Sequence, residues 1–355
     1  MKTLDDVTYL SKLKGAIVGR FAGCALGAPV ELMSQEALIA FANSIEGQEF
    51  PPTNYFLQAP NPDSPRYLVG KGRQFTRHEM AFLPPDDDIM YTLLSLLMME
   101  KHGRNLQVSD VAQFWLKYLP VECTYTAERT TLNNLMNGVS PQEAAIVNNL
   151  ELDYIGAAIR IDGYGYVFPG NPHEAARMAY QDAILSHRKE GLHSALYFSA
   201  LISLAFTSDD LDQAMVDALD VIPNESKFYQ EISWAISVKD TIHDYVTANA
   251  IVTKRYPGMS WVHAINNAVL TIWGINFGKH DFEKGISQAV AMAYDNDCTG
   301  ATVGSVLGAY LGIEAIDSKW YKPWHNTIRS YLKGIPEFQL DDVIERFFRL
   351  YQQFQ

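Results

Sequence analysis

Two runs of regularly spaced glycines constrain the fold of this chain more than any other feature. The stretch GAIVGRFAGCALGAPVE, residues 15–31, has a glycine at every fourth position: Gly15, Gly19, Gly23 and Gly27. The stretch DNDCTGATVGSVLGAYLG, residues 295–312, repeats the pattern with Gly300, Gly304, Gly308 and Gly312. A glycine inside a helix costs about 1 kcal/mol relative to alanine, and residues four apart share one helix face. Each run therefore predicts a helix with a bare strip, packed closely against the other or against a shared partner.

Helical periodicity dominates the chain and predicts an all-α protein of about a dozen helices, in a single domain covering residues 1–355. The predicted helices cover 88–101, 109–119, 172–206, 227–247, 260–276, 281–293 and 299–312. The stretch YGYVFP, around 164–169, is a short candidate for extended structure.

Two segments interrupt the helical pattern. The first, at about 47–85, is rich in proline and forms a long insert without helical periodicity. The second, at 162–172, is rich in glycine and aromatic residues and is expected to be a loop. Loops as long as the first are usually functional or mobile, so we expect that segment to act as a lid over a site.

The charge balance excludes several classes of function. The net charge is −13 and the pI is about 5.1, without a cluster of Lys and Arg, which argues against a nucleic-acid partner and an anionic membrane surface. An acidic chain does suit a site that collects cations. The three cysteines form no CxxC motif, which disfavours a disulfide framework or a structural zinc site. The first residues do not resemble a secretory signal, and the apolar stretches are too short to span a membrane, so we expect a cytoplasmic protein.

Acidic residues gather at three predicted helix ends. Asp86, Asp87 and Asp88 open the helix at 88–101, Asp295 and Asp297 precede the second glycine run, and Glu31 ends the first run. Helix capping explains one or two such aspartates. Three in succession exceed what capping requires, and hard divalent cations such as Mg²⁺ and Mn²⁺ prefer oxygen ligands of this kind. Together the aspartate groups predict a binuclear cation site.

In combination, these features resemble the ADP-ribosylglycohydrolase family. The order GxxxGxxxGxxLGxPxE, then an acidic triplet opening a helix, then DxDxxGAxxGxxxGAxxG spans residues 15 to about 312. Two intermediate pieces agree: GAAIR at 156–160 resembles the family's Gly-Ala-Met-Arg segment, and AILSH, ending at His187, resembles its Thr-His segment. The resemblance implies an all-α fold and two divalent cations, Mg²⁺ or Mn²⁺.

The resemblance also implies roles for individual residues. The metal ligands would be Asp86, Asp87, Asp88, Asp295 and Asp297, and the catalytic residues Glu31, Asp87 and Asp297. The substrate-binding residues would be Gly156, Arg160, Gly163, Tyr164 and His187. From the residue types alone, Arg160 either binds a pyrophosphate or pairs with a structural acid, and His187 is either a packed helix residue or a substrate contact. The tyrosines and glycines of 163–166 form a candidate loop facing adenine.

Several positions depart from the family pattern. Asp86 replaces a hydroxyl residue, Ile89 and Cys298 replace threonines, and Tyr154 and Ile155 stand where other members have Gly and Asn. A thiol is a poor ligand for hard cations, so Thr299 is an alternative to Cys298. These changes affect the choice of substrate more than the metal chemistry.

The function that the resemblance implies is metal-dependent hydrolysis of a glycosidic bond. The substrate would be an ADP-ribosylated protein or a small ADP-ribosyl compound, N- or O-linked, and the product ADP-ribose. One alternative is a catalytically silent member that binds ADP-ribose or has a structural role. Another is a two-metal phosphoesterase that cleaves the pyrophosphate. The chain has no GxSxG, HExxH or Walker spacing.

Overall fold

The computed structural model describes residues 4–355, and within this range the chain is built almost entirely of helices. The α-helices are α1 (Asp6–Gly27), α2 (Gln35–Asn43), α3 (Asp87–His102), α4 (Val108–Tyr118), α5 (Thr126–Met136), α6 (Asp162–Val167), α7 (Pro172–Ala183), α8 (Lys189–Thr207), α9 (Leu211–Asp217), α10 (Lys227–Val238), α11 (Tyr245–Arg255), α12 (Ala264–Gly278), α13 (Phe282–Ala291), α14 (Asn296–Leu311) and α15 (Leu340–Phe354). Two antiparallel ribbons hold the four short strands β1 (Pro65–Arg66), β2 (Gly70–Lys71), β3 (Thr327–Arg329) and β4 (Glu337–Gln339). The prediction of an all-α protein is confirmed.

The two glycine runs pack against each other at the centre of the molecule. A methyl group at Gly19 would lie 2.2 Å from the carbonyl oxygen of Gly304, and one at Gly23 would lie 2.0 Å from that of Gly300. Gly15 faces Gly308 in the same way. The partners run in opposite order along the two helices, so α1 and α14 are antiparallel, and only glycine permits this distance between their backbones.

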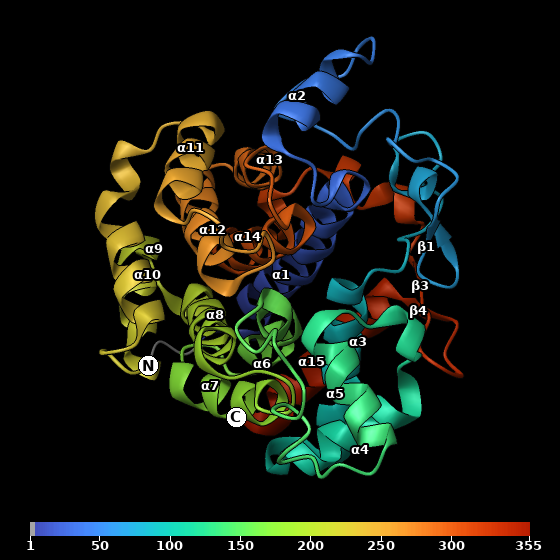
Figure 1. Cartoon of the computed structure of the whole chain (residues 1–355), viewed down its shortest axis with the longest axis vertical. Helices are drawn as coiled ribbons and strands as arrows, with labels where there is room; N and C mark the ends of the chain where they lie inside the picture. The colour runs from blue at the N-terminus through green and yellow to red at the C-terminus, as the bar shows by residue number, and fades with distance from the viewer. Residues whose placement is uncertain (1–3) are drawn as a thin grey trace.

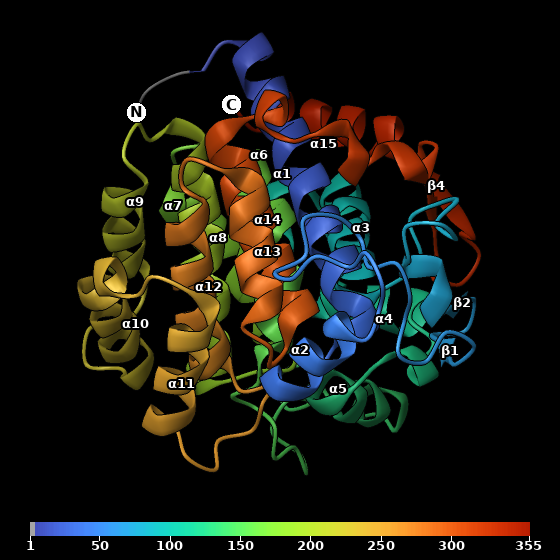
Figure 2. The same ribbon diagram turned by 90° about the horizontal axis from the view of Figure 1, so that it is seen from above.

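The remaining helices surround this pair. Helices α9, α10 and α11 lie on one side of α1 and α14, and helices α3, α4 and α5 lie on the other (Figures 1 and 2). Helix α15 returns near the chain's C-terminus to pack beside α1 and α3. The central helices are buried nearly throughout, which explains why α14 lacks a polar face along most of its length.

Several predicted helices agree closely with the structure, whereas others are divided. The predictions 88–101, 109–119 and 281–293 match α3, α4 and α13 within two residues at each end. The prediction 172–206 is wrong as one helix because α7 ends at Ala183 and α8 begins at Lys189. The prediction 227–247 likewise covers α10 and the start of α11.

The glycine- and aromatic-rich segment is mostly helical. Residues 162–167 form α6, so the predictions of a loop at 162–172 and of extended structure at 164–169 are wrong. Every residue of α6 is buried, and α6 packs against α7, α8 and α15. This packing outweighs the low helix propensity of two glycines.

The insert at 47–85 has the irregular character that its composition indicates. It contains the β1–β2 hairpin and the short 3₁₀-helix Gly72–Phe75, and it buries Tyr55, Phe56 and Phe75. Among residues 4–355, no single helix is long and apolar enough to cross a membrane, although Asp6–Val30 and Gln35–Asn43, bent by 88°, reach that length and composition together.

Candidate active site

The first part of the site lies where α1 ends. After Gly27 the chain makes a short 3₁₀-turn over Ala28–Val30, with Pro29 in its first turn, and Glu31 follows directly. A methyl group on Gly27 would lie 2.5 Å from the backbone nitrogen of Asp297, so the glycine lets this turn contact the start of α14. The last glycine of the run thus brings Glu31 toward an aspartate more than 260 residues away in the sequence.

The second part is the start of α3. Asp86 is the N-cap residue, and its Oδ1 accepts a hydrogen bond of 3.3 Å from the backbone N–H of Asp88. Capping therefore accounts for one aspartate of the triplet. Asp87 accepts a 2.6 Å hydrogen bond from the hydroxyl of Tyr67, and Asp88 accepts one of 3.2 Å from the thiol of Cys298.

The third part is the start of α14, and it is reached through strained backbone. Ala293 and Tyr294 have φ angles of 65° and 66°, a left-handed conformation that costs a non-glycine residue about 1–2 kcal/mol. The carbonyl of Tyr294 accepts a hydrogen bond from the backbone N–H of Leu32, whose φ is also positive at 57°. These residues connect the end of α1 to the start of α14 and bring Asp295 near Glu31.

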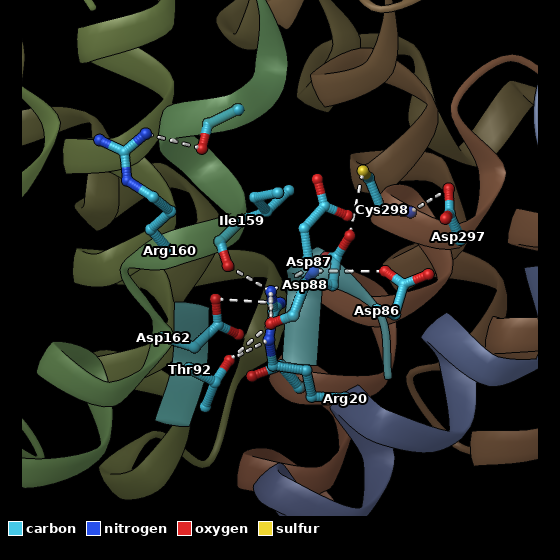
Figure 3. A network of polar contacts seen from close by, with 12 residues as sticks. Arg20, Asp86, Asp87, Asp88, Thr92, Ile159, Arg160, Asp162, Asp297 and Cys298 are labelled. Carbon is cyan, nitrogen blue, oxygen red and sulfur yellow. Dashed lines mark hydrogen bonds and ion pairs between the residues drawn. The ribbon is translucent and has the colours of Figure 1, made fainter. Parts of the chain in front are cut away.

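The six acidic residues therefore converge, and we refer to them as the carboxylate cluster: Glu31, Asp86, Asp87, Asp88, Asp295 and Asp297. The predicted metal ligands lie at the starts of α3 and α14, and Glu31 follows the end of α1, so the cluster joins three helices that are distant in the sequence. Figure 3 shows Asp86, Asp87 and Asp88 grouped opposite Cys298 and Asp297, with the side chain of Arg20 beneath them. The structure thus brings together the predicted ligands and the predicted catalytic residues.

Arg20 supports the cluster from its buried side. Its guanidinium lies 3.0 Å from Asp88 Oδ1 and 3.1 Å from Asp162 Oδ1, and it donates a 2.8 Å hydrogen bond to the hydroxyl of Thr92. It also donates to the carbonyl of Ile159. All of these side chains are buried. Arg20 therefore fixes the orientation of Asp88 and offsets part of its charge.

The cluster's electrostatics reflect its burial. Burial and the neighbouring carboxylates raise the pKa of Asp87 and Asp297 well above the usual range. Burial also raises the pKa of Asp88, against the opposing effect of Arg20. Burial and the charge of Glu31 raise the pKa of Asp295 to about 7. A cluster of this kind favours binding a proton or a cation because its ionised carboxylates repel one another.

The donor set fits a divalent cation. Two triads each place one ligand atom per residue within 4.8 Å of the others: Cys24, Asp86 and Asp88 form one triad, and Asp295, Asp297 and Cys298 form the other. The Oδ1 atom of Asp295 is buried and has no hydrogen-bond partner among the described residues, which leaves it available to a ligand. Each triad pairs two hard oxygen donors with one softer thiol.

A cavity of about 370 Å³ opens beside the cluster. Glu31, Asp87 and Asp295 line its acidic wall. The facing wall is largely apolar and aromatic and contains Tyr125, Tyr154, Ile155, Gly156 and Val262. Of the predicted substrate-binding residues, Gly156 is the one that lines this cavity.

Gly156 has a clear packing reason to be glycine. A methyl group there would lie 2.1 Å from Oε1 of Glu128, a carboxylate that also lines the cavity. Arg160 donates a 2.7 Å hydrogen bond to the same oxygen of Glu128 and one of 2.9 Å to Asp182. Of the two interpretations of Arg160, the structure agrees with pairing to structural acids. Arg160 is fully buried and lies behind Glu128, away from the cavity.

His187 also lies behind this wall. Its ring is fully buried, its Nδ1 lies 2.8 Å from the hydroxyl of Ser186, and its Nε2 lies 4.0 Å from Glu128. Burial, together with the charge of Arg160, lowers the pKa of His187 well below the ordinary value. Its place agrees with the packed-residue interpretation.

Gly163 and Tyr164 are also outside the cavity. A methyl group at Gly163 would lie 2.3 Å from the hydroxyl of Ser95, so helix packing requires this glycine. Tyr164 is fully buried and donates a 2.8 Å hydrogen bond to Asp182. The predicted loop facing adenine is wrong because both residues belong to the buried helix α6.

The sequence analysis missed Arg66, which lies inside the carboxylate cluster. Its Nη2 atom lies close to three carboxylate oxygens: Asp86 Oδ2 at 2.7 Å, Glu31 Oε2 at 2.9 Å and Asp297 Oδ2 at 3.0 Å. Arg66 belongs to β1 of the long insert, where no motif or spacing marks it. The adjacent Tyr67 and the more distant Glu128 line the cavity and were missed for the same reason.

The fold and the site define a class of protein: an all-helical protein with a buried carboxylate cluster beside a cavity of substrate size. A sequence model of the family described as ADP-ribosylglycohydrolase matches residues 5–354, so the chain belongs to that family. The resemblance stated for residues 15 to about 312 is confirmed.

One solved structure similar to this chain is titled "ADP-ribosylglycohydrolase-related protein complex". It is 18% identical, with a TM-score of 0.63, over 98% of this chain and 100% of the other. At that identity the similarity shows the fold alone. No curated protein matches the chain.

Proposed function

We propose that this chain is a cation-dependent hydrolase that cleaves the glycosidic bond of an ADP-ribosylated protein or of a small ADP-ribosyl compound, and so releases ADP-ribose. Family membership supports hydrolysis of ADP-ribosyl compounds as the class of reaction. The observation that carries the finer proposal is the convergence of six carboxylates, three of which, Glu31, Asp87 and Asp295, line a cavity of about 370 Å³. Burial and mutual repulsion raise the pKa values of Asp87 and Asp297, and a bound cation would relieve that repulsion.

The residues that would hold a divalent cation are Asp88, Asp295, Asp297 and Asp87, with Cys298 adjacent. A bound divalent cation supplies Lewis acidity, which lowers the pKa of a coordinated water and orients ribose hydroxyls. Mg²⁺ and Mn²⁺ suit the carboxylates, and we propose these as the ions.

Glu31 is placed to act on the substrate. Its side chain is 33% exposed and lines the cavity, whereas Asp86, Asp88, Asp295 and Asp297 are buried. We assign Glu31 the role of accepting a proton from the attacking water or of positioning the scissile bond. Glycosidic cleavage develops positive charge on the sugar ring, and the acidic wall stabilises that charge.

The facing wall suits the adenosine end of the substrate. Tyr125 and Tyr154 present aromatic surface to the cavity, and Ile155 and Val262 add apolar surface. A base ring stacks on such side chains without requiring charged partners. The cavity therefore combines an acidic end for the reacting ribose with an apolar end for the base.

A second candidate is a catalytically silent member that binds ADP-ribose. The guanidinium of Arg66, held among Glu31, Asp86 and Asp297, favours this candidate because it already neutralises part of the cluster. The thiol of Cys298, which stands in place of a hydroxyl, also favours the catalytically silent candidate.

Product analysis distinguishes these candidates. The purified protein is incubated with arginine-, serine- and O-acetyl-linked ADP-ribose, with Mg²⁺, Mn²⁺ or EDTA, and the products are identified by mass spectrometry. We expect free ADP-ribose in the presence of a cation and none in EDTA. Appearance of AMP would indicate a phosphoesterase, and ADP-ribose binding without any product would indicate the silent member.

The Asp297→Ala variant tests the site assignment. We expect it to remain folded and to lose more than about 100-fold of the activity, because loss of a ligand exceeds the 10–100-fold effect of a residue that supports one. Asp341→Ala is the matched control because Asp341 is an aspartate in the first turn of α15, exposed and remote from the cavity. Full activity in Asp297→Ala would refute the assignment.

A further inference from the structure

Arg66 places its guanidinium among three residues of the carboxylate cluster. Its Nη2 atom contacts carboxylate oxygens from three separate elements: the end of the first 3₁₀-turn, the start of α3 and the start of α14. Two of these residues, Asp86 and Asp297, are predicted metal ligands. The side chain of Arg66 is 18% exposed, so the charge is largely withdrawn from water.

The surrounding residues hold Arg66 in this position. The guanidinium carbon lies 5.3 Å from the centre of the Phe75 ring and 5.7 Å from that of the Tyr67 ring. The hydroxyl of Tyr67 donates a 2.6 Å hydrogen bond to the Asp87 carboxylate, and it accepts one of 3.1 Å from the backbone N–H of Asp87. The β1–β2 hairpin is therefore anchored to the start of α3 through Arg66 and the adjacent Tyr67.

The guanidinium and a divalent cation would compete at this corner. Arg66 Nη2 lies 2.7 Å from Asp86 Oδ2 and 3.0 Å from Asp297 Oδ2. An ion bound to either oxygen at the 2.0–2.1 Å typical of Mg²⁺ would lie close to the guanidinium, and the two positive charges would repel each other. Each triad shares one residue with this corner: Asp86 belongs to the triad with Cys24 and Asp88, and Asp297 belongs to the other triad. The unpaired Oδ1 of Asp295, in contrast, is left free by the arginine.

We propose that Arg66 is the resident cation of the Glu31–Asp86–Asp297 corner and keeps a divalent ion out of it while the β1–β2 hairpin is docked. One positive charge is thereby built into the chain where the family resemblance implies a second metal. The proposal concerns ion binding in the absence of substrate, so its outcome does not depend on the proposed hydrolysis.

Counting bound ions tests the proposal directly. Mn²⁺ binding is measured by calorimetry and by electron paramagnetic resonance for the wild type, Arg66→Met and Arg66→Lys. We expect Arg66→Met to bind one more Mn²⁺ per chain, or the same number at least tenfold more tightly. Arg66→Lys keeps the charge and should bind as the wild type does. Arg73→Met is the matched control because Arg73 lies in the same insert and pairs with the exposed Asp63.

Equal stoichiometry and affinities within twofold for the wild type and a folded Arg66→Met would overturn the proposal. Folding of Arg66→Met only in the presence of Mn²⁺ would support it, since the ion would then supply the missing charge. Should Arg66→Met fail to fold under either condition, Tyr67→Phe decides. It removes the hydroxyl contact with Asp87, and we expect it to tighten Mn²⁺ binding at least threefold; unchanged binding would contradict the proposal.

Discussion

Cys298 shows how one side chain alters the chemistry available to the carboxylate cluster. Its thiol donates to Asp88 at 3.2 Å, and its backbone N–H donates to Asp297 at 3.0 Å. Burial raises the pKa of this thiol well above its ordinary value, so without a cation it remains protonated. A thiolate prefers softer metals than Mg²⁺. The residue therefore biases the site toward thiophilic ions.

We expect Cys298→Thr to shift this preference toward hard cations. The Mg²⁺ affinity should rise and the Cd²⁺ affinity should fall, changing their ratio by at least about tenfold, equivalent to about 1.4 kcal/mol. Calorimetric titrations measure both affinities, and the loss of the sulfur-to-cadmium ultraviolet absorption provides an independent signal. Cys123→Ser is the control because Cys123 is buried but belongs to neither triad. An unchanged ratio in Cys298→Thr would show that the thiol is not a ligand.

At the residue scale, the sequence predicts the acidic half of the site and misses the rest. Asp86, Asp87 and Asp88 are consecutive, and this density exceeds the needs of capping. No motif or spacing around Arg66 or Glu128 indicates a functional role, because each residue joins the site through contacts with elements that are distant in the sequence. The predicted substrate role of Tyr164 failed because burial of a whole helix depends on partners that local sequence does not specify.

At the element scale, the glycine-lined contact between α1 and α14 positions Glu31 relative to Asp295 and Asp297. Backbone touches backbone at three glycine pairs, so no side chain can adjust to relieve an added atom. Glu31 lies just beyond the end of α1, and Asp297 lies in the first turn of α14. A small displacement of α1 relative to α14 therefore moves these carboxylates relative to one another.

We expect Gly304→Ala to be strongly destabilising. The added methyl would lie 2.0 Å from the carbonyl oxygen of Gly19, and overpacking against rigid backbone should cost more than about 3 kcal/mol. Urea unfolding measures the loss. Gly47→Ala is the comparison because its methyl would meet its nearest atom at 3.8 Å, so its cost is that of a positive φ, about 1–2 kcal/mol. Similar losses of unfolding free energy in both variants would mean that the contact between α1 and α14 adjusts easily to an added methyl group.

Helix breaks were harder to predict than helices. The turn between α7 and α8 places Lys189 at a φ of 49°, and the N–H of Arg188 donates to the carbonyl of Leu152. No glycine or proline marks this turn in the sequence. The start of α11 does leave a signal, because Asp244 caps it by accepting the N–H of Thr247 at 2.7 Å. Apolar periodicity continues across both breaks and conceals them.

At the scale of the whole molecule, the chain's acidity and its buried cluster act together. The raised pKa of Asp295, about 7, exceeds the value of about 3.9 for an unfolded aspartate. Between about pH 4 and 7 the folded metal-free protein therefore binds more protons than the unfolded chain, and its stability falls as the pH rises.

The prediction of one domain over residues 1–355 stays a prediction, alongside a family match over 5–354.

We expect Mn²⁺ to stabilise the protein more at pH 8 than at pH 6, because at pH 6 protons compete for the same carboxylates. At an ion concentration 100 times the Kd, the gain is about 2.7 kcal/mol, or a rise in Tm of about 4 °C. Thermal unfolding in Mn²⁺ and in EDTA at each pH measures this difference. Asp297→Ala should show a smaller rise at pH 8. Equal shifts at both pH values would contradict the link between proton and ion binding.

The pairing of α1 with α14 also determines when the site can form as the chain is synthesised. Helix α1 ends at Gly27 and leaves the ribosome before α14, which begins at Asn296. The glycine strip of α1 therefore remains without its partner while the residues between the two helices are synthesised. A nascent chain that stops before Asp295 holds Glu31 and the aspartate triplet but lacks the residues that complete the cluster. Prematurely terminated products of this kind therefore contain no complete site.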